Sequence, residues 1–111
     1  MTEIINFEDF TKVDLRVGTI LEVHDFPEAR NPAYQLTIDF GGLGIKKSSA
    51  QITTLYKKED LINRQIVAVV NFPKKQIGKF MSECLVLGAV NSKDVILLHP
   101  ETKVLNGSVV S

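Results

Sequence analysis

The sequence has few of the residues that form covalent or metal cross-links, with one cysteine, Cys84, and two histidines among 111 residues. A single cysteine excludes an internal disulfide bond and a cysteine-based zinc site. His24 and His99 both lie next to the ends of expected strands, and their spacing matches no metal-binding motif. We therefore expect neither a metal ion nor a cofactor.

Long hydrophobic runs are also absent. The longest apolar stretches, residues 66–70 and 84–90, are far shorter than the roughly 20 residues of a transmembrane helix. The first ten residues carry Glu3, Glu8 and Asp9, where a signal peptide carries lysines followed by an apolar run. We therefore expect a cytoplasmic protein that does not insert into membranes.

The chain as a whole has no excess of positive or negative charge, but two of its segments do. Thirteen basic and thirteen acidic residues give a net charge of zero, which by itself argues against a strongly basic nucleic-acid binder. Residues 1–28, however, hold seven acidic and two basic residues, whereas residues 46–79 hold eight basic and two acidic ones. The net charges of these segments are −5 and +6, so the neutral total conceals a basic segment.

The composition is that of one globular domain spanning residues 1–111. Hydrophobic residues make up 44% and charged residues 23% of the chain, as in ordinary folded proteins. A chain of this length can bury one apolar core, but it is too short for a catalytic domain together with a substrate domain.

Alternating apolar residues predict a mainly β protein. Residues 13–23 form a long expected strand, and Gly18 in its middle suggests a bend or bulge. One face of that strand is predicted to carry Val13, Leu15, Val17, Thr19, Leu21 and Val23. Further strands are expected at residues 34–40, 43–50, 65–72, 83–90 and 94–99. The apolar spacing over residues 49–63 favours a helix, and a short helix is also expected at residues 6–12.

Three strands, a helix and two strands follow one another in the order of an OB-fold. We therefore predict a five-stranded Greek-key β-barrel with one helix between strands 3 and 4. The short N-terminal helix and the segment after residue 94 are additions to this barrel. The alternative is a general sandwich of five or six strands.

Basic residues are placed on the two loops that frame the binding face of an OB-fold. Lys74, Lys75 and Lys79 lie between expected strands 4 and 5, and Arg30 lies between strands 1 and 2. Phe26 and Tyr34 provide rings on which bases could stack. The alternative is that the lysines only solvate a loop and that the aromatic residues are core anchors.

No set of residues indicates catalysis. Cys84 lies within an apolar strand pattern, which is typical of an inert core cysteine. The pair Ser48–Ser49 lacks the glycine-flanked elbow of hydrolases, and the glycine-rich segment 41–44 joins two strands rather than opening a helix. We therefore expect a protein that is not an enzyme.

Two segments resemble the tRNA-binding domain family. They are Asp14–Ile20, with the sequence DLRVGTI, and Asn71–Glu83, with the sequence NFPKKQIGKFMSE. Residues 26–30, 45–53 and 69–73 add to the resemblance, which extends from about residue 7 to 110. It implies an OB-fold homodimer that binds the structured corner of tRNA, and in one chaperone-like, export-associated branch also unfolded or preprotein peptides.

The resemblance also implies which residues bind. The expected contacts to tRNA or a related structured RNA are Lys74, Lys75, Lys79, Ser82, Asn71, Arg30, Lys47 and Ser49. The expected contacts to peptide are Phe26, Phe72, Phe80 and Met81. The alternative function is a secretion chaperone that binds preproteins and has little physiological RNA binding.

The two ends of the chain are more apolar than free ends need to be. The apolar residues concerned are Phe7, Phe10, Val104, Leu105, Val109 and Val110. In stand-alone members of the family such additions form a two-fold interface, so the resemblance implies a homodimer. The alternative is that both ends cover the openings of their own barrel.

Overall fold

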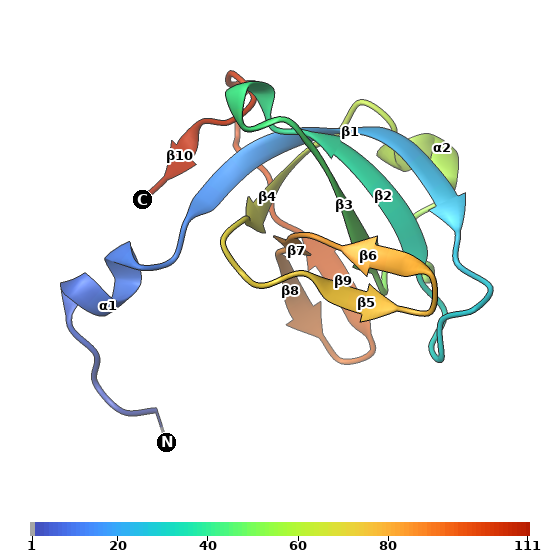
Figure 1. Ribbon diagram of the computed structural model, residues 1–111, viewed down its shortest axis with the longest axis horizontal. Coiled ribbons are helices and arrows are strands. Elements are labelled where there is room, and N and C mark those ends of the chain that lie inside the picture. The colour runs from blue at the N-terminus through green and yellow to red at the C-terminus, as the bar shows by residue number, and fades with distance from the viewer. Residues whose placement is uncertain (1) are drawn as a thin grey trace.

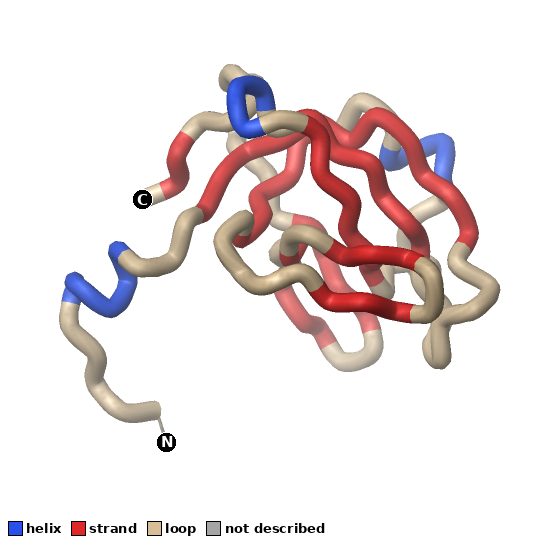
Figure 2. The backbone as a smooth tube through the Cα atoms, viewed as in Figure 1, coloured by secondary structure: helices blue, strands red, loops and turns tan. Residues whose placement is uncertain are grey.

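A curled antiparallel sheet dominates the computed structural model, which describes residues 2–111. Its strands are in the spatial order β3-β2-β1-β4-β7, and every neighbouring pair is antiparallel. They are β1 (Leu15–Asp25), β2 (Tyr34–Asp39), β3 (Ile45–Ala50), β4 (Gln65–Val69) and β7 (Leu85–Val86). Figures 1 and 2 show how strongly the sheet bends.

The two edges of the sheet approach each other where β3 meets the segment before β7. The Glu83 amide donates to the Lys47 carbonyl at 2.7 Å, and the Lys47 amide donates to Glu83 Oε1 at 2.9 Å. The buried Ser48 hydroxyl donates to the Cys84 carbonyl at 2.9 Å. These bonds nearly close the barrel, and the predicted mainly β, OB-fold architecture is confirmed.

Strand β1 is long because it pairs with β2 along its second half and with β4 along its first half. Ile20 pairs with Ile38 and Glu22 pairs with Thr37, so Leu21 is an extra, bulged residue. The bulge brings both Ile20 and Val23 into the core and leaves Leu21 exposed. The predicted single apolar face of residues 13–23 is therefore wrong beyond Thr19, since a bulge reverses the alternation of side chains.

Alternate side chains of β2, and that of the residue after it, point into the core. Tyr34, Leu36, Ile38 and Phe40 are all buried. Ile52 and Leu61 from the connection between β3 and β4 also belong to the core, although the helix in that connection is only the single turn α2 (Lys58–Leu61).

The predicted helix over residues 49–63 is therefore too long. Ser49 and Ala50 belong to β3, where they pair with β2. Between β3 and α2, Tyr56 holds the connection in place, because its carbonyl accepts from the Tyr34 hydroxyl at 2.8 Å and its own hydroxyl accepts from the Leu97 amide at 3.0 Å. Tertiary contacts thus replace the helical hydrogen bonds that the apolar spacing suggested.

Two small hairpins stand beside the main sheet. One consists of β5 (Lys75–Ile77) and β6 (Phe80–Ser82), and the other of β8 (Gly88–Asn91) and β9 (Asp94–Leu97). The expected strand over residues 83–90 is divided between β7 and β8. Gly88 packs closely there, since a Cβ at this position would collide with Val95 Cγ1.

The terminal segments extend beyond the barrel. Helix α1 (Phe7–Thr11) agrees with the expected helix over residues 6–12, and Asn6 and Asp9 form a reciprocal capping box at its start. Strand β10 (Val109–Val110) pairs with the beginning of β1, and the 3-10 turn η1 (Gly41–Leu43) precedes β3. Among residues 2–111, no helix is long and apolar enough to cross a bilayer.

Candidate nucleic-acid interface

The β5–β6 hairpin carries the predicted basic segment. Lys74 precedes β5, Lys75 begins it, and Lys79 lies in the turn; all three side chains are exposed. Gly78 has a φ of +60°, which suits the tight two-residue turn between Ile77 and Phe80. The segment predicted as a loop is thus a two-stranded support that projects its lysines outward.

Two phenylalanines fasten the hairpin to the loop between β1 and β2. The ring centroids of Phe26 and Phe80 are 5.2 Å apart, with the ring planes inclined at 58°, a favourable arrangement for an aromatic pair. Phe26 is only 4% exposed, so its ring serves mainly to anchor the hairpin. Of the four residues predicted to contact peptide, Phe72 and Met81 are the exposed ones, at 52% and 40%.

Arg30 faces the hairpin across a groove of about 310 Å³. We call this the outer groove; its lining includes Phe26, Arg30, Ser49, Gln51, Lys75 and Ile77. The residues come from the β1–β2 loop, the end of β3 and the hairpin. The fold therefore brings the two predicted basic loops to opposite sides of one groove.

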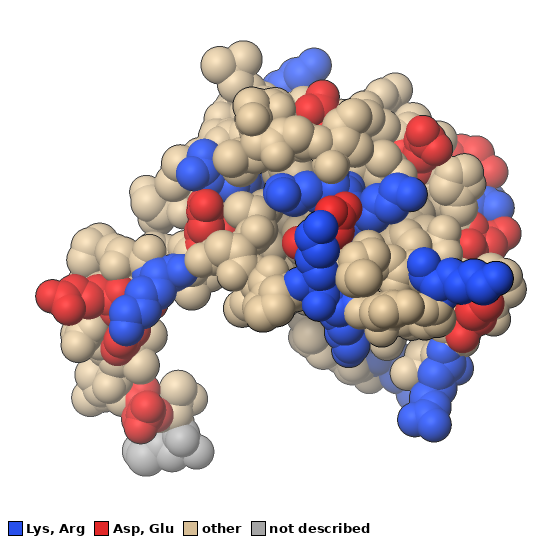
Figure 3. Space-filling model, viewed as in Figure 1, with Lys and Arg blue, Asp and Glu red and all other residues tan. Residues whose placement is uncertain are grey.

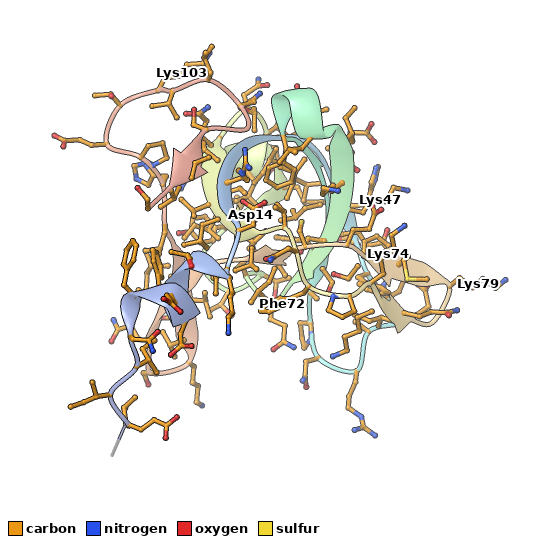
Figure 4. The ribbon with its side chains drawn as sticks, turned by 60° about the vertical axis from the view of Figure 1, so that its left-hand side comes forward. Asp14, Lys47, Phe72, Lys74, Lys79 and Lys103 are labelled. Atoms are coloured by element: carbon orange, nitrogen blue, oxygen red, sulfur yellow. The ribbon has the colours of Figure 1, made fainter. Side chains whose placement is uncertain are left out.

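Lys47 belongs to the same surface because β3 runs beside the hairpin. Figure 4 shows Lys47, Lys74 and Lys79 on one side of the molecule, with Lys103 at the far end. Glu83 lies among these cations, and its Oε2 is 3.6 Å from Lys74 Nζ. Figure 3 shows the resulting surface, in which basic side chains spread over the hairpin face around a small acidic area.

The three polar residues predicted to contact RNA do not all lie together in the structure. Ser49 and Ser82 are brought together, with the Ser49 amide donating to Ser82 Oγ at 3.4 Å. Asn71 instead uses its amide group within the protein: Oδ1 accepts from the Asp14 amide at 2.9 Å, and Nδ2 donates to the Lys12 carbonyl at 2.7 Å. Asn71 thereby connects the end of β4 to the segment between α1 and β1.

Two residues of this surface were missed by sequence reasoning. Gln51 lines the outer groove from the end of β3, and Glu83 contacts both Lys47 and Lys74. Gln51 lies two residues after Ser49, so the alternation of strand side chains was a usable signal. No comparable signal existed for Glu83, because its contacts depend on barrel closure.

Cys84 is a buried thiol at the base of the surface. Burial is the largest influence on it and raises its pKa to about 11, so the thiolate that would act as a nucleophile is scarce at neutral pH. Within residues 2–111, no group of three His, Cys, Asp or Glu side chains is arranged to hold a metal ion. What this surface offers a ligand is a set of exposed cations with serine hydroxyls among them.

Comparison with known proteins identifies the class. A family model described as a tRNA binding domain matches residues 15–109. The chain therefore belongs to the tRNA binding domain family.

Two solved structures of CsaA chaperones are similar over almost the whole chain. The Bacillus anthracis protein is 55% identical with a TM-score of 0.93, covering 98% of this chain and 100% of that one. The Picrophilus torridus protein is 53% identical with a TM-score of 0.91, covering 97% and 100%.

The curated relatives are much longer proteins. The methionine–tRNA ligase of Pyrococcus furiosus is 37% identical over 108 residues, which are 97% of this chain and 15% of the ligase. The chain thus spans about 15% of the length of this relative. A MetRS-related protein from Pyrococcus horikoshii, 21% identical with a TM-score of 0.87 over 99% of this chain and 100% of that one, shares the fold.

Proposed function

We propose that this chain is a binding domain, without catalytic activity of its own, for tRNA or a related structured RNA. The observation that carries the proposal is the gathering of Lys47, Lys74, Lys75 and Lys79 around the hairpin, with Arg30 across the outer groove. Membership in the tRNA binding domain family supports the same conclusion. Cytoplasmic location is part of this proposal, since tRNA is the partner.

The cations act on the RNA backbone rather than on its sequence. Lysine and arginine side chains neutralise phosphates and release bound counterions, so affinity falls steeply as salt rises. Because these cations are held at fixed positions on a rigid barrel, they would select an RNA by the spacing of its phosphates. This is recognition of shape rather than of sequence. Ser49 and Ser82 lie between the cations as donors and acceptors for sugars or base edges.

The proposal is tested by titrating bulk tRNA against the protein at several salt concentrations. Replacing Lys74, Lys75 and Lys79 by alanine should lower the log–log salt slope by about 0.7–0.9 for each phosphate that is no longer neutralised. A matched triple variant at Lys57, Lys93 and Lys103, which are exposed lysines on other segments, controls for net charge. Salt-independent binding, or equally weakened binding by the two triple variants, would contradict the proposal.

We also infer that the chain forms a homodimer through its terminal segments. Phe7 is 76% and Leu105 is 85% exposed, although both are large apolar residues. Helix α1 extends away from the barrel, on the side where the C-terminus lies (Figure 1). Contact of these segments with a second copy would remove apolar surface from water and present two basic surfaces to one RNA.

A second candidate function is the binding of unfolded or preprotein peptides during export. It is supported by the similarity to CsaA chaperones and by a mainly apolar hollow of about 220 Å³ beside Phe72, Pro73 and Leu85. An apolar peptide segment held there should be largely insensitive to salt, unlike RNA.

Aggregation of an unfolded client protein tests this second function. A stoichiometric amount of the chain should suppress aggregation, and Phe72→Ser should weaken the suppression while leaving the salt slope for tRNA unchanged. Unchanged aggregation of the client would contradict it. Competition between tRNA and an apolar peptide then shows whether the two ligands use overlapping surfaces.

A further inference from the structure

A second groove runs beneath the β5–β6 hairpin, next to the outer groove. It has a volume of about 340 Å³ and lies between the hairpin, the end of β3, β7 and β9. We call it the inner groove. Ser49, Gln51, Lys75 and Ile77 line both grooves, so the two form one continuous depression with Lys75 at their junction.

The inner groove is apolar at its base and polar at its rim. Ile52, Cys84 and Leu97, all buried in the core, form its base. The rim carries Ser49 and Gln51, whose side-chain polar atoms make no hydrogen bond to another residue within the described part of the chain. These groups are therefore free to bind a ligand whose apolar part enters the groove and whose edge is polar.

The charge around the two grooves identifies the rest of the ligand. Lys75 and Arg30 are cationic, and no acidic residue among residues 2–111 lines either groove. A ligand with a negative group beside its apolar part satisfies this arrangement, whereas a neutral apolar peptide leaves the cations without a partner. The volume of about 340 Å³ is at the small end of ligand pockets, which suits one nucleotide rather than a helix.

We propose that the inner groove takes one unstacked base of the bound RNA. The phosphate of that nucleotide then lies against Lys75, and the adjacent phosphate of the RNA lies beside Arg30 in the outer groove. The inference rests on the proposed RNA-binding function and specifies what the RNA must offer. Bases within a duplex are stacked and their faces are inaccessible, so the preferred RNA has a bulge or loop from which a base can turn outward.

The test compares two short RNA hairpins that differ only in one unpaired 2-aminopurine nucleotide, bulged in the first and absent from the second. The wild-type protein should bind the bulged hairpin at least about fivefold more tightly, the lower end of what one bound base contributes. The 2-aminopurine emission should also change on binding, because the base moves from water into an apolar groove.

Two variants locate the effect in the groove. Ser49→Leu fills it, and Gln51→Ala, at an exposed position that should not affect folding, removes a rim amide. Both belong to the binding surface, so the readout is the ratio of the two affinities: each variant should lose most of the preference for the bulge, whatever affinity it loses for the paired hairpin. Thr54→Leu, at an exposed position outside both grooves, is the matched control and should keep the preference.

The outcomes separate this inference from the function on which it rests. Equal affinity of the wild type for both hairpins, with weaker binding by the triple lysine variant, overturns the nucleotide site and leaves RNA binding intact. Loss of peptide binding in Ser49→Leu with an unchanged bulge preference also overturns it, because the groove then belongs to a peptide. Failure to bind either hairpin or bulk tRNA overturns the proposed function itself.

Discussion

Gly18 is packed against two side chains that have no room to move. A Cβ built at this position would lie 2.7 Å from Ile38 Cγ2 and 2.8 Å from the Phe40 ring, and both of those residues are fully buried. Gly18→Ala should therefore destabilise the barrel by about 1–3 kcal/mol, as overpacked cores do. Urea unfolding should show a lower midpoint with an unchanged slope.

Gly42 provides the control for this prediction. It lies in η1, and a Cβ there would meet no atom within 4 Å. Gly42→Ala should leave the unfolding midpoint unchanged or slightly raised. Equal effects of the two substitutions would show that close packing at Gly18 is not the cause.

Glu83 is an acidic residue within a surface proposed to bind an anion. Its Oε2 is paired with Lys74 Nζ at 3.6 Å, while its Oε1 accepts from the Lys47 amide. Glu83→Gln keeps an acceptor for that amide and frees Lys74 for phosphate. Affinity for tRNA should rise by up to about fivefold, since a partly exposed ion pair contributes roughly 0–1 kcal/mol. Glu101→Gln removes the same charge outside both grooves and should raise the affinity for tRNA less.

Cys84 gives the protein a dependence on pH at alkaline values. Its pKa is raised from 9.0 to about 11 by burial, so the folded state holds this proton more tightly than the unfolded state. The stabilisation is complete below pH 9 and is lost as pH rises towards 11. The free energy of unfolding should fall less steeply over this interval in Cys84→Ala than in the wild type, and an equal decline would contradict the assignment.

At the scale of elements, the sequence predicted most accurately those strands whose pattern is unbroken. In β2 the alternation of Tyr34, Leu36, Ile38 and Phe40 is uninterrupted, and all four are buried. In β1 the bulge at Leu21 could not be located, because it depends on how β2 pairs with β1 rather than on composition.

The basic hairpin and the surface around it were predictable to different degrees. The lysines of residues 74–79 follow from the sequence motif, and their exposure agrees with it. The grooves were not predictable, since the outer one forms where the end of β3 and the hairpin meet the β1–β2 loop, and the inner one where they meet β7 and β9. The structure shows the Asn71 amide bonded to Lys12 and Asp14, and no local pattern reveals these bonds. Its expected contact with RNA stays a prediction.

At the scale of the whole molecule, the exposed apolar ends make the proposed dimerisation straightforward to test. Phe7 and Phe10 contact each other, with ring centroids 6.4 Å apart, and neither is buried. Phe7→Ser combined with Phe10→Ser should weaken the dimer by at least about a hundredfold, because burying one phenylalanine contributes roughly 1.5–3 kcal/mol.

Analytical ultracentrifugation over a range of concentrations measures this change. The β-sheet circular dichroism should be unaffected, since α1 contributes no buried residue to the barrel. A wild type that is monomeric at all concentrations, or a double variant that dimerises as strongly as the wild type, would contradict the inferred interface.

The separation of the β5–β6 hairpin from the main sheet has a consequence for local stability. Its strands pair only with each other, and the Phe26–Phe80 contact and the bonds of Glu83 to Lys47 hold it in place. The hairpin can therefore open while the barrel stays folded, and its amide hydrogens should exchange with solvent much faster than those of β1 and β4. A ligand seated beneath the hairpin would slow that exchange selectively. Protection of the amides of Ile77 and Phe80, the hydrogen-bonded pair that closes the two-residue turn, would therefore report occupancy of the groove without any label on the ligand.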